Sequence, residues 1–201
     1  TGILAGAGNR DPSKQGMASG ANIKVIAYTA GFQDATLSLH LNENVTITNS
    51  SYSEGCNEGY NLNAQTVDQQ ITQHPTLMHV FSAGNRGTDN CGYGAGPVWC
   101  TITGGHKIAK NVIATANLRP DGSLDPTSSR GPAADGRLKP DIAANGTEQN
   151  STAPNHAYII FGGTSGASPG IAGCLAQLTQ AWKTLTNQAP KTAMLKAALL
   201  N

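Results

Sequence analysis

The sequence predicts an α/β fold in which a mainly parallel sheet carries helices on both faces, within one domain that spans residues 1–201. Short apolar runs rich in β-branched residues alternate along the chain with longer segments of helical spacing. Such runs are typical of strands buried on both faces, and strands separated by helices favour a parallel sheet. Hydrophobic residues make up 38% of the chain and charged residues 12%, which is enough apolar material for a sizeable core.

The predicted strands share a short, apolar, β-branched composition, and they cover residues 22–30, 44–51, 76–84 and 111–118. Ligands of parallel α/β sheets bind at the carboxyl ends of the strands. The last three of these strands end in the polar sequences NSSYS, SAGNRG and NLRPDG. We therefore expect a functional site among these strand ends.

Helical spacing appears in residues 63–74, which end before Pro75, and again in residues 167–186. Another helix is expected to start near Pro190. These segments supply the helices that cover the sheet.

The charge balance excludes two classes of partner. Lys and Arg number 13 against 12 Asp and Glu, so the formal net charge is +1. This gives no electrostatic case for binding nucleic acid or an anionic membrane. No apolar run reaches the length of a membrane-spanning helix, and no signal segment opens the chain.

The cysteines indicate an oxidising compartment rather than a metal site. Cys56, Cys91 and Cys100 lie in turn-rich sequence, where a disulfide between two of the three is expected. Cys174 lies on the predicted apolar helix and is expected to be a buried free thiol. The spacings match no zinc pattern, so we expect no metal and no cofactor.

Ser165 lies between glycines and an apolar helix, in the sequence FGGTSGASPGIAG. Glycines let another backbone come close, and a helix that starts here directs its positive end at the same point. These features suit a reactive serine. The alternative is a helix cap, since serine is a common residue at that position.

Asn85 follows the strand in residues 76–84 and stands beside Gly84. A neutral amide at the end of a strand can donate a hydrogen bond to an oxyanion. The alternative is that Asn85 belongs to an ordinary turn.

Taken together and in this order, three segments closely resemble the subtilisin-like serine proteases: SAGN at 82–85, SSRGPAADGRLKPDIAANG at 128–146 and GGTSGASPGIAG at 162–173. The family's nucleophile motif, Gly-Thr-Ser-x-Ala-x-Pro, is met by residues 163–169. Gly166 stands where the family usually has Met, and AANG at 143–146 replaces a more usual Ala-Pro-Gly. These departures put rate and stability in question, not the family.

The resemblance implies a serine endopeptidase of the secreted, extracellular or periplasmic space. Ser165 matches the family's nucleophile, and its backbone N–H matches one donor to the oxyanion. Asn85 matches the side-chain donor to the oxyanion. An extended protein or peptide substrate is implied. The residues implied to contact it are Ser51, Tyr52, Ser82, Ala83, Gly84, Gly163 and Thr164.

The family's catalytic Asp and His have no match in this sequence. The opening TGILAGAG resembles the helix that follows the family's His, and KTAMLKAALLN resembles its penultimate helix. We therefore expect a partial domain, incomplete at both ends, whose Asp and His lie upstream. Asp141 matches a structural position of the family. Structural or surface roles are expected for the chain's own histidines, which are His40, His74, His79, His106 and His156.

Without a general base the serine is a weak nucleophile, so this chain alone is expected to be nearly inactive. The alternatives are a non-catalytic module that binds extended peptides, and one chain of a nicked enzyme whose Asp and His lie on a separate segment. A nucleotide site is rejected. GILAGAG has no strand ahead of it. GYGAGP is flanked by cysteines and ends in Pro97, so it offers no helix N-terminus to a phosphate.

Overall fold

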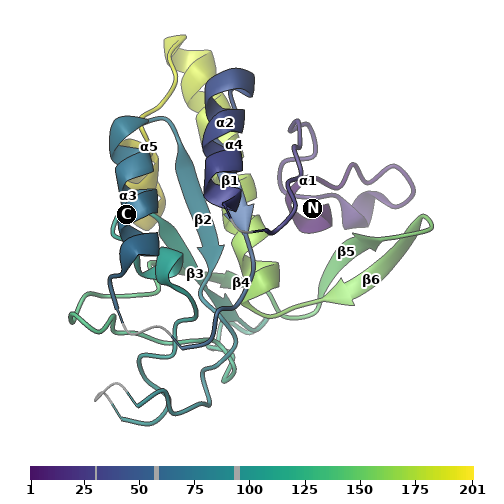
Figure 1. Ribbon diagram of the computed structural model, residues 1–201. Coiled ribbons are helices and arrows are strands. Elements are labelled where there is room, and N and C mark those ends of the chain that lie inside the picture. Colours follow the sequence, from purple (N-terminus) through teal and green to yellow (C-terminus); the bar gives the residue numbers. More distant parts are fainter. Residues whose placement is uncertain (30, 57–58, 93–95) are drawn as a thin grey trace.

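The computed structural model describes residues 1–29, 31–56, 59–92 and 96–201 (Figure 1). Its main sheet has four parallel strands in the order β1 (Ile47–Ser50), β2 (Met78–Ser82), β3 (Ile113–Leu118) and β4 (Ile142–Asn145). The first three confirm predicted strands. β4 was not predicted, because its sequence IAAN is too short and too poor in β-branched residues to signal a strand.

Helices cover both faces of this sheet, as predicted. In Figure 1, α2 (Phe32–Glu43) and α3 (Leu62–Gln73) lie in front of the strands, and α4 (Thr164–Thr186) and α5 (Thr192–Leu200) lie behind them. α2 was not predicted, because it buries only Phe32 and Thr36 and its apolar residues form no single stripe. Within the described ranges, no helix combines the length and apolar character needed to cross a bilayer.

The remaining elements are short. α1 (Gly2–Ala5), η1 (Pro12–Lys14) and η2 (Gly105–Ile108) are single turns. β5 (Gln149–Ala153) and β6 (Ala157–Phe161) form an antiparallel hairpin, which stands apart from the main sheet in Figure 1.

The core lies on both faces of β2, whose five residues are all buried. Met78 and Val80 point to the face where Ile171 and Leu175 of α4 pack. Phe81 points to the opposite face, in the same cluster as residues of α3. This burial on both faces is the reason for the continuous apolar run in the sequence.

The predicted strand at residues 22–30 is wrong for the residues that the structure describes. Residues 22–29 belong to no strand and are exposed, and residue 30 lies outside the described residues. Val25 is 80% exposed and Tyr28 is 57% exposed. A strand needs a hydrogen-bonded neighbour as well as β-branched residues, and no described strand pairs with this segment.

One disulfide joins two of the three candidate cysteines. Cys56 and Cys91 are bonded, while Cys100 is free and buried. Cys174 is free, as predicted, but it is half-buried rather than buried. The bond links the segment after β1 to the loop after β2.

Asp141 links β3 to the residues before β4 and to α5. Its Oδ2 accepts hydrogen bonds from the Ala114 N–H at 2.8 Å and from Lys139 Nζ at 2.6 Å, and its Oδ1 accepts one from Lys196 Nζ at 2.9 Å. Burial lowers the pKa of Lys139 to about 8, against the opposing effect of the Asp141 carboxylate. These contacts agree with the structural role expected for Asp141.

Replacement of this carboxylate should destabilise the fold. We expect Asp141→Asn to lower the free energy of unfolding by about 3–5 kcal/mol, because it leaves a buried ammonium without its counter-charge. Asp135→Asn is the matched control, since Asp135 pairs with Arg137 near the surface and is worth at most about 1 kcal/mol. Urea unfolding measures both, and equal stabilities of the two variants would contradict the structural role of Asp141.

Candidate active site

Thr164 connects the end of β2 to the start of α4. The Gly84 N–H donates to Thr164 Oγ1 at 3.1 Å, and the Thr164 hydroxyl in turn donates to Asn85 Oδ1 at 2.9 Å. The Thr164 N–H donates to the same oxygen at 2.9 Å. The side chain of Thr164 is fully buried. These bonds bring Asn85 to the residue that precedes Ser165, although the two lie far apart in the sequence.

The same bonds orient the amide group of Asn85. Because Oδ1 accepts both donors of Thr164, the Nδ2 group is left as the free donor, and it has no hydrogen-bond partner among the described residues. A Cβ atom on Gly163 would lie 2.9 Å from Nδ2. Gly163 also has a φ of 79°, which disfavours other residues. Glycine is therefore required for this approach.

Ser165 lies in the first turn of α4. The N-cap of the helix is Gly163, and no side chain caps it, so the alternative that Ser165 caps this helix is wrong. The N–H groups of Gly166 and Ala167 donate to the Gly163 carbonyl at 2.8 and 3.2 Å. Within the described part of the chain, neither the N–H nor the hydroxyl of Ser165 has a hydrogen-bond partner. Both groups are free to meet a ligand.

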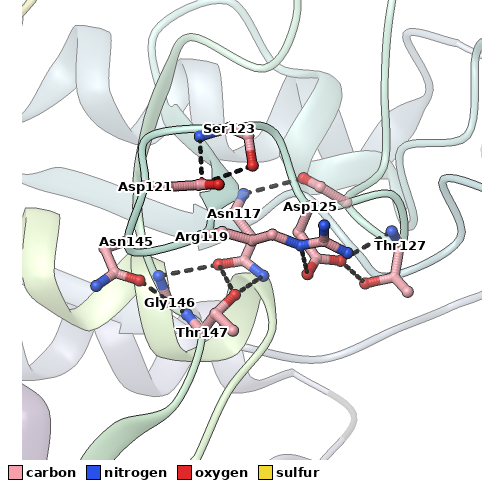
Figure 2. Close-up of polar contacts among 10 residues, drawn as sticks. Asn117, Arg119, Asp121, Ser123, Asp125, Thr127, Asn145, Gly146 and Thr147 are labelled. Atoms are coloured by element: carbon pink, nitrogen blue, oxygen red, sulfur yellow. Dashed lines mark hydrogen bonds and ion pairs between the residues drawn. The ribbon is translucent and has the colours of Figure 1, made fainter.

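A second polar network holds the loop that packs against this turn. Figure 2 shows the buried Asn117 side chain, whose Oδ1 accepts from the Gly146 N–H at 2.9 Å and whose Nδ2 donates to Thr147 Oγ1 at 3.1 Å. The Asn117 N–H donates to Ser128 Oγ. A Cβ atom on Gly166 would lie 2.7 Å from the Gly146 carbonyl oxygen. Sequence reasoning missed Asn117, since only its place at a strand end marked it.

Two aspartates, Asp121 and Asp125, form hydrogen bonds within the loop after β3, next to the Asn117 network (Figure 2). Asp121 accepts hydrogen bonds from the N–H and hydroxyl of Ser123, and Asp125 accepts those of Thr127. These bonds lower the pKa of both carboxyls below their usual range. The aspartates therefore fix the loop and are not part of the serine site.

The predicted substrate-contact residues differ in exposure. After β1, Ser51 is exposed and Tyr52 is half-buried. Ser82, Ala83 and Gly84 are buried. The Ala83 and Gly84 carbonyls accept hydrogen bonds from the N–H groups of residues 103 and 129, at 3.0 and 2.8 Å. This segment is thus held in place by the rest of the fold.

Lys107 fixes the backbone beside Tyr52, and sequence reasoning did not find it. Its ammonium group is fully buried and donates to the Tyr52 carbonyl and, at 2.9 Å, to Thr103 Oγ1. Burial lowers the pKa of Lys107 to about 7, while Glu54 raises it. The Lys107 amine therefore links the backbone after β1, at Tyr52, to the segment that carries Thr103.

In the described ranges, no histidine is hydrogen-bonded to Ser165. His79 accepts from the Thr48 hydroxyl at 2.9 Å and donates to Gln70 at 3.1 Å, and burial lowers its pKa to about 4. His106 is buried and contacts the Tyr52 hydroxyl. The others are His40, which bonds the Val45 carbonyl, His74, which touches the His40 ring, and the exposed His156. These environments match the structural or surface roles expected.

A parallel α/β sheet with a serine at the start of a helix, beside a fixed amide donor at a strand end, defines the class of subtilisin-like serine hydrolases. The chain belongs to the subtilase family, whose model matches residues 1–201.

Relatives of known name agree with this assignment. A C5a peptidase of Streptococcus pyogenes is 39% identical over 74 residues, which cover 35% of this chain and 6% of that protein. A PII-type proteinase of Lactococcus lactis subsp. cremoris is 41% identical over 83 residues, or 41% of this chain and 4% of the relative. The matched stretches are thus a small part of each relative's length.

Solved structures show the same fold. The CspB protease of Clostridium perfringens has a TM-score of 0.78 at 15% identity, with 92% of this chain and 70% of that chain covered. A cold-adapted subtilisin-like serine proteinase has a TM-score of 0.66 at 19% identity, with 99% of this chain and 64% of that chain covered.

The contact between Gly166 and Gly146 is expected to be sensitive to a single methyl group. Gly166→Ala should lower the free energy of unfolding by about 1–3 kcal/mol, because its Cβ would lie 2.7 Å from the carbonyl oxygen of Gly146 and the backbone would have to shift. Gly170→Ala in the same helix is the control. Its Cβ meets nothing within 4 Å, so better helix propensity should stabilise the fold by about 0.5–1 kcal/mol. Thermal unfolding distinguishes the two variants. Melting temperatures that shift in the same direction would refute the proposed effect of the Gly166–Gly146 contact.

Proposed function

We propose that this chain is the nucleophile-bearing part of a serine endopeptidase domain. Ser165 Oγ attacks the carbonyl carbon of a peptide bond, its proton passes to a general base, and the amine leaves to give an acyl-enzyme that water then hydrolyses. The observation that carries the proposal is the link through Thr164. It leaves the amide of Asn85 as a free donor beside the residue that bears the hydroxyl.

The oxyanion of the tetrahedral intermediate accepts hydrogen bonds from the N–H of Ser165 and from Asn85 Nδ2. Both donors are free among the described residues, and the first lies at the positive end of α4. Because Thr164 is buried and its hydroxyl bonds Gly84 and Asn85, we assign it a positioning role rather than a contact with substrate.

The general base comes from outside residues 1–201 in this proposal. Among the histidines of the described chain, His40, His79 and His106 are hydrogen-bonded elsewhere, His74 packs against the His40 ring, His156 is exposed, and none bonds Ser165. We propose that a segment of the same protein amino-terminal to Thr1 supplies the His and its Asp partner, either in one polypeptide or as a separate bound chain. Residues 1–201 alone are then nearly inactive.

The substrate is an extended protein or peptide segment. The exposed Ser51 and the half-buried Tyr52 follow edge strand β1, where a substrate backbone can pair. In this proposal, residues 82–84 form one wall of the pocket for the substrate residue before the scissile bond. Gly163, which has no side chain, leaves room for the substrate backbone. The Cys56–Cys91 bond supports a secreted, extracellular or periplasmic location, since disulfides persist in oxidising compartments.

A non-catalytic peptide-binding module is the second candidate. It is favoured by one observation: within the described ranges no base is hydrogen-bonded to Ser165. The following experiment decides between the two.

A fluorophosphonate probe should label Ser165 in the protein that carries its amino-terminal segment, and Ser165→Ala should abolish the added mass. The probe reacts only with an activated serine, so labelling requires the base. Intact-mass spectrometry reads the result, with residues 1–201 alone as the comparison. Absence of labelling in the folded, complete protein would refute the catalytic proposal and leave the peptide-binding module.

Asn85→Ala should slow turnover while KM changes little, because the donor acts on the transition state. In subtilisin itself, where this effect is established, loss of the side-chain donor costs about 10²–10³-fold in kcat, and we adopt that size for Asn85.

Thr164→Val should reproduce part of that loss in kcat, since it frees the Asn85 amide from the hydroxyl that orients it. Thr164→Ser retains the hydroxyl and should restore most of the rate. Steady-state kinetics on a peptide substrate measures all three variants. A Thr164→Val enzyme with unchanged kcat, or a Thr164→Ser enzyme as slow as it, would contradict the positioning role.

A further inference from the structure

A cavity of about 480 Å³ lies beside the segment that follows β1. It is lined by Glu54, Cys56, residues 59–61, Gly104 and Gly105. Its volume is within the range of pockets that bind ligands. The cavity is therefore large enough for one long side chain of a bound peptide.

This cavity adjoins the segment 82–84, which follows β2. The Thr103 N–H donates to the Ala83 carbonyl at 3.0 Å, and the next residue, Gly104, lines the cavity. Cys56, which also lines the cavity, forms an isolated antiparallel bridge with Thr103. The walls at residues 56 and 104 are thus fixed to each other and to the segment 82–84.

Glu54 alone carries a charge among the described residues that line the cavity. A Cβ atom on Gly104 would lie 3.3 Å from Glu54 Oε2, so this oxygen lies beside a residue that has no side chain to cover it. Within the described ranges, Oε2 accepts no hydrogen bond and Glu54 forms no ion pair. One carboxylate oxygen is therefore open to a ligand in the cavity.

The other oxygen of Glu54 is held by a neutral donor. Glu54 Oε1 accepts a hydrogen bond from the Tyr28 hydroxyl at 2.9 Å. Partial burial, together with this hydrogen bond, raises the pKa of Tyr28 to about 12, so the phenol stays protonated at neutral pH. The bond orients the carboxylate and leaves its negative charge in place.

Two basic residues lie near the cavity, and neither lines it. The Lys107 amine is held by a backbone carbonyl and a hydroxyl, and burial lowers its pKa to about 7, so it is only partly charged at neutral pH. Arg86 lies near Gly55 and pairs with Asp89. Lys107 weakens the negative potential of Glu54 but does not occupy its open oxygen.

We propose that Glu54 selects a substrate with a cationic side chain, arginine or lysine, at the residue before the scissile bond. The inference rests on the proposed function, which places residues 82–84 beside that substrate residue. A guanidinium or ammonium group at Oε2 forms charge-assisted hydrogen bonds, which are stronger than neutral ones. An acidic side chain there is repelled, and an apolar one desolvates the carboxylate without replacing its hydrogen bonds to water. Glu54 determines specificity and takes no part in the bond-breaking step.

Two peptides that differ only at this residue test the selection. One carries arginine and the other citrulline, which has nearly the same shape but no charge. In the protein with its amino-terminal segment, we expect kcat/KM to be at least about tenfold higher for arginine. Glu54→Gln should bring the ratio within about twofold of one, while an unchanged rate on citrulline shows that the variant is folded. Asp121→Asn is the control and should keep the wild-type ratio, since Asp121 is exposed and does not line the cavity. A wild-type ratio near one, or an unchanged ratio in Glu54→Gln, would overturn the proposal.

Binding of the same two peptides separates this inference from the proposed function. Calorimetry on the Ser165→Ala protein measures both Kd values, and we expect arginine to bind at least about tenfold more tightly than citrulline. Selective binding without cleavage by the wild type would support the role of Glu54 and refute the catalytic proposal. Cleavage of both peptides at equal rates would support catalysis and overturn the role of Glu54. Equal affinities, or no binding of either peptide, would also overturn that role.

Discussion

The site depends on one buried threonine. The Thr164 hydroxyl accepts a hydrogen bond from the Gly84 N–H, and Thr164 donates two hydrogen bonds, from its N–H and its hydroxyl, to the Asn85 side chain. These bonds fix the end of β2 to the start of α4. Because the hydroxyl lies in the dry interior, an unmade bond there is costly, and the arrangement tolerates little variation. The sheet and α4 are packed through Ile171 and Leu175, but packing alone does not orient an amide. That orientation comes from the polar link.

Glycines perform the complementary task of bringing backbones together around this link. A Cβ on Gly146 would lie 2.4 Å from the Gly163 carbonyl oxygen, and one on Gly84 would lie 2.3 Å from Thr103 Oγ1. Side chains at these positions would push apart the segments that hold the serine turn. The absence of Met at position 166 fits this geometry, since Gly166 lies against Gly146. The departure from the family pattern belongs to a tightly packed turn rather than a loosened one.

Much of this architecture could be predicted from the sequence, and the exceptions have physical causes. β2 and β3 were evident because burial on both faces requires continuous apolar runs, and α4 was evident from its periodicity. β4 escaped because hydrogen bonding to β3, rather than its own residues, makes IAAN a strand. Residues 22–28 show the reverse case, with strand composition but no partner. Motifs marked Ser165 and Asn85 as candidates, whereas no local sequence pattern marks Asn117 and Lys107, which act through contacts between distant segments.

The β5–β6 hairpin leaves and rejoins the fold at almost one point, because Gly146 before it touches Gly163 after it. The excursion between them is a closed loop anchored at its base, and α1 packs along β5. The cost of closing such a loop grows only slowly with its length. Its tip at residues 154–156 is therefore a place where evolution or an engineer can add or remove residues while the serine turn keeps its position.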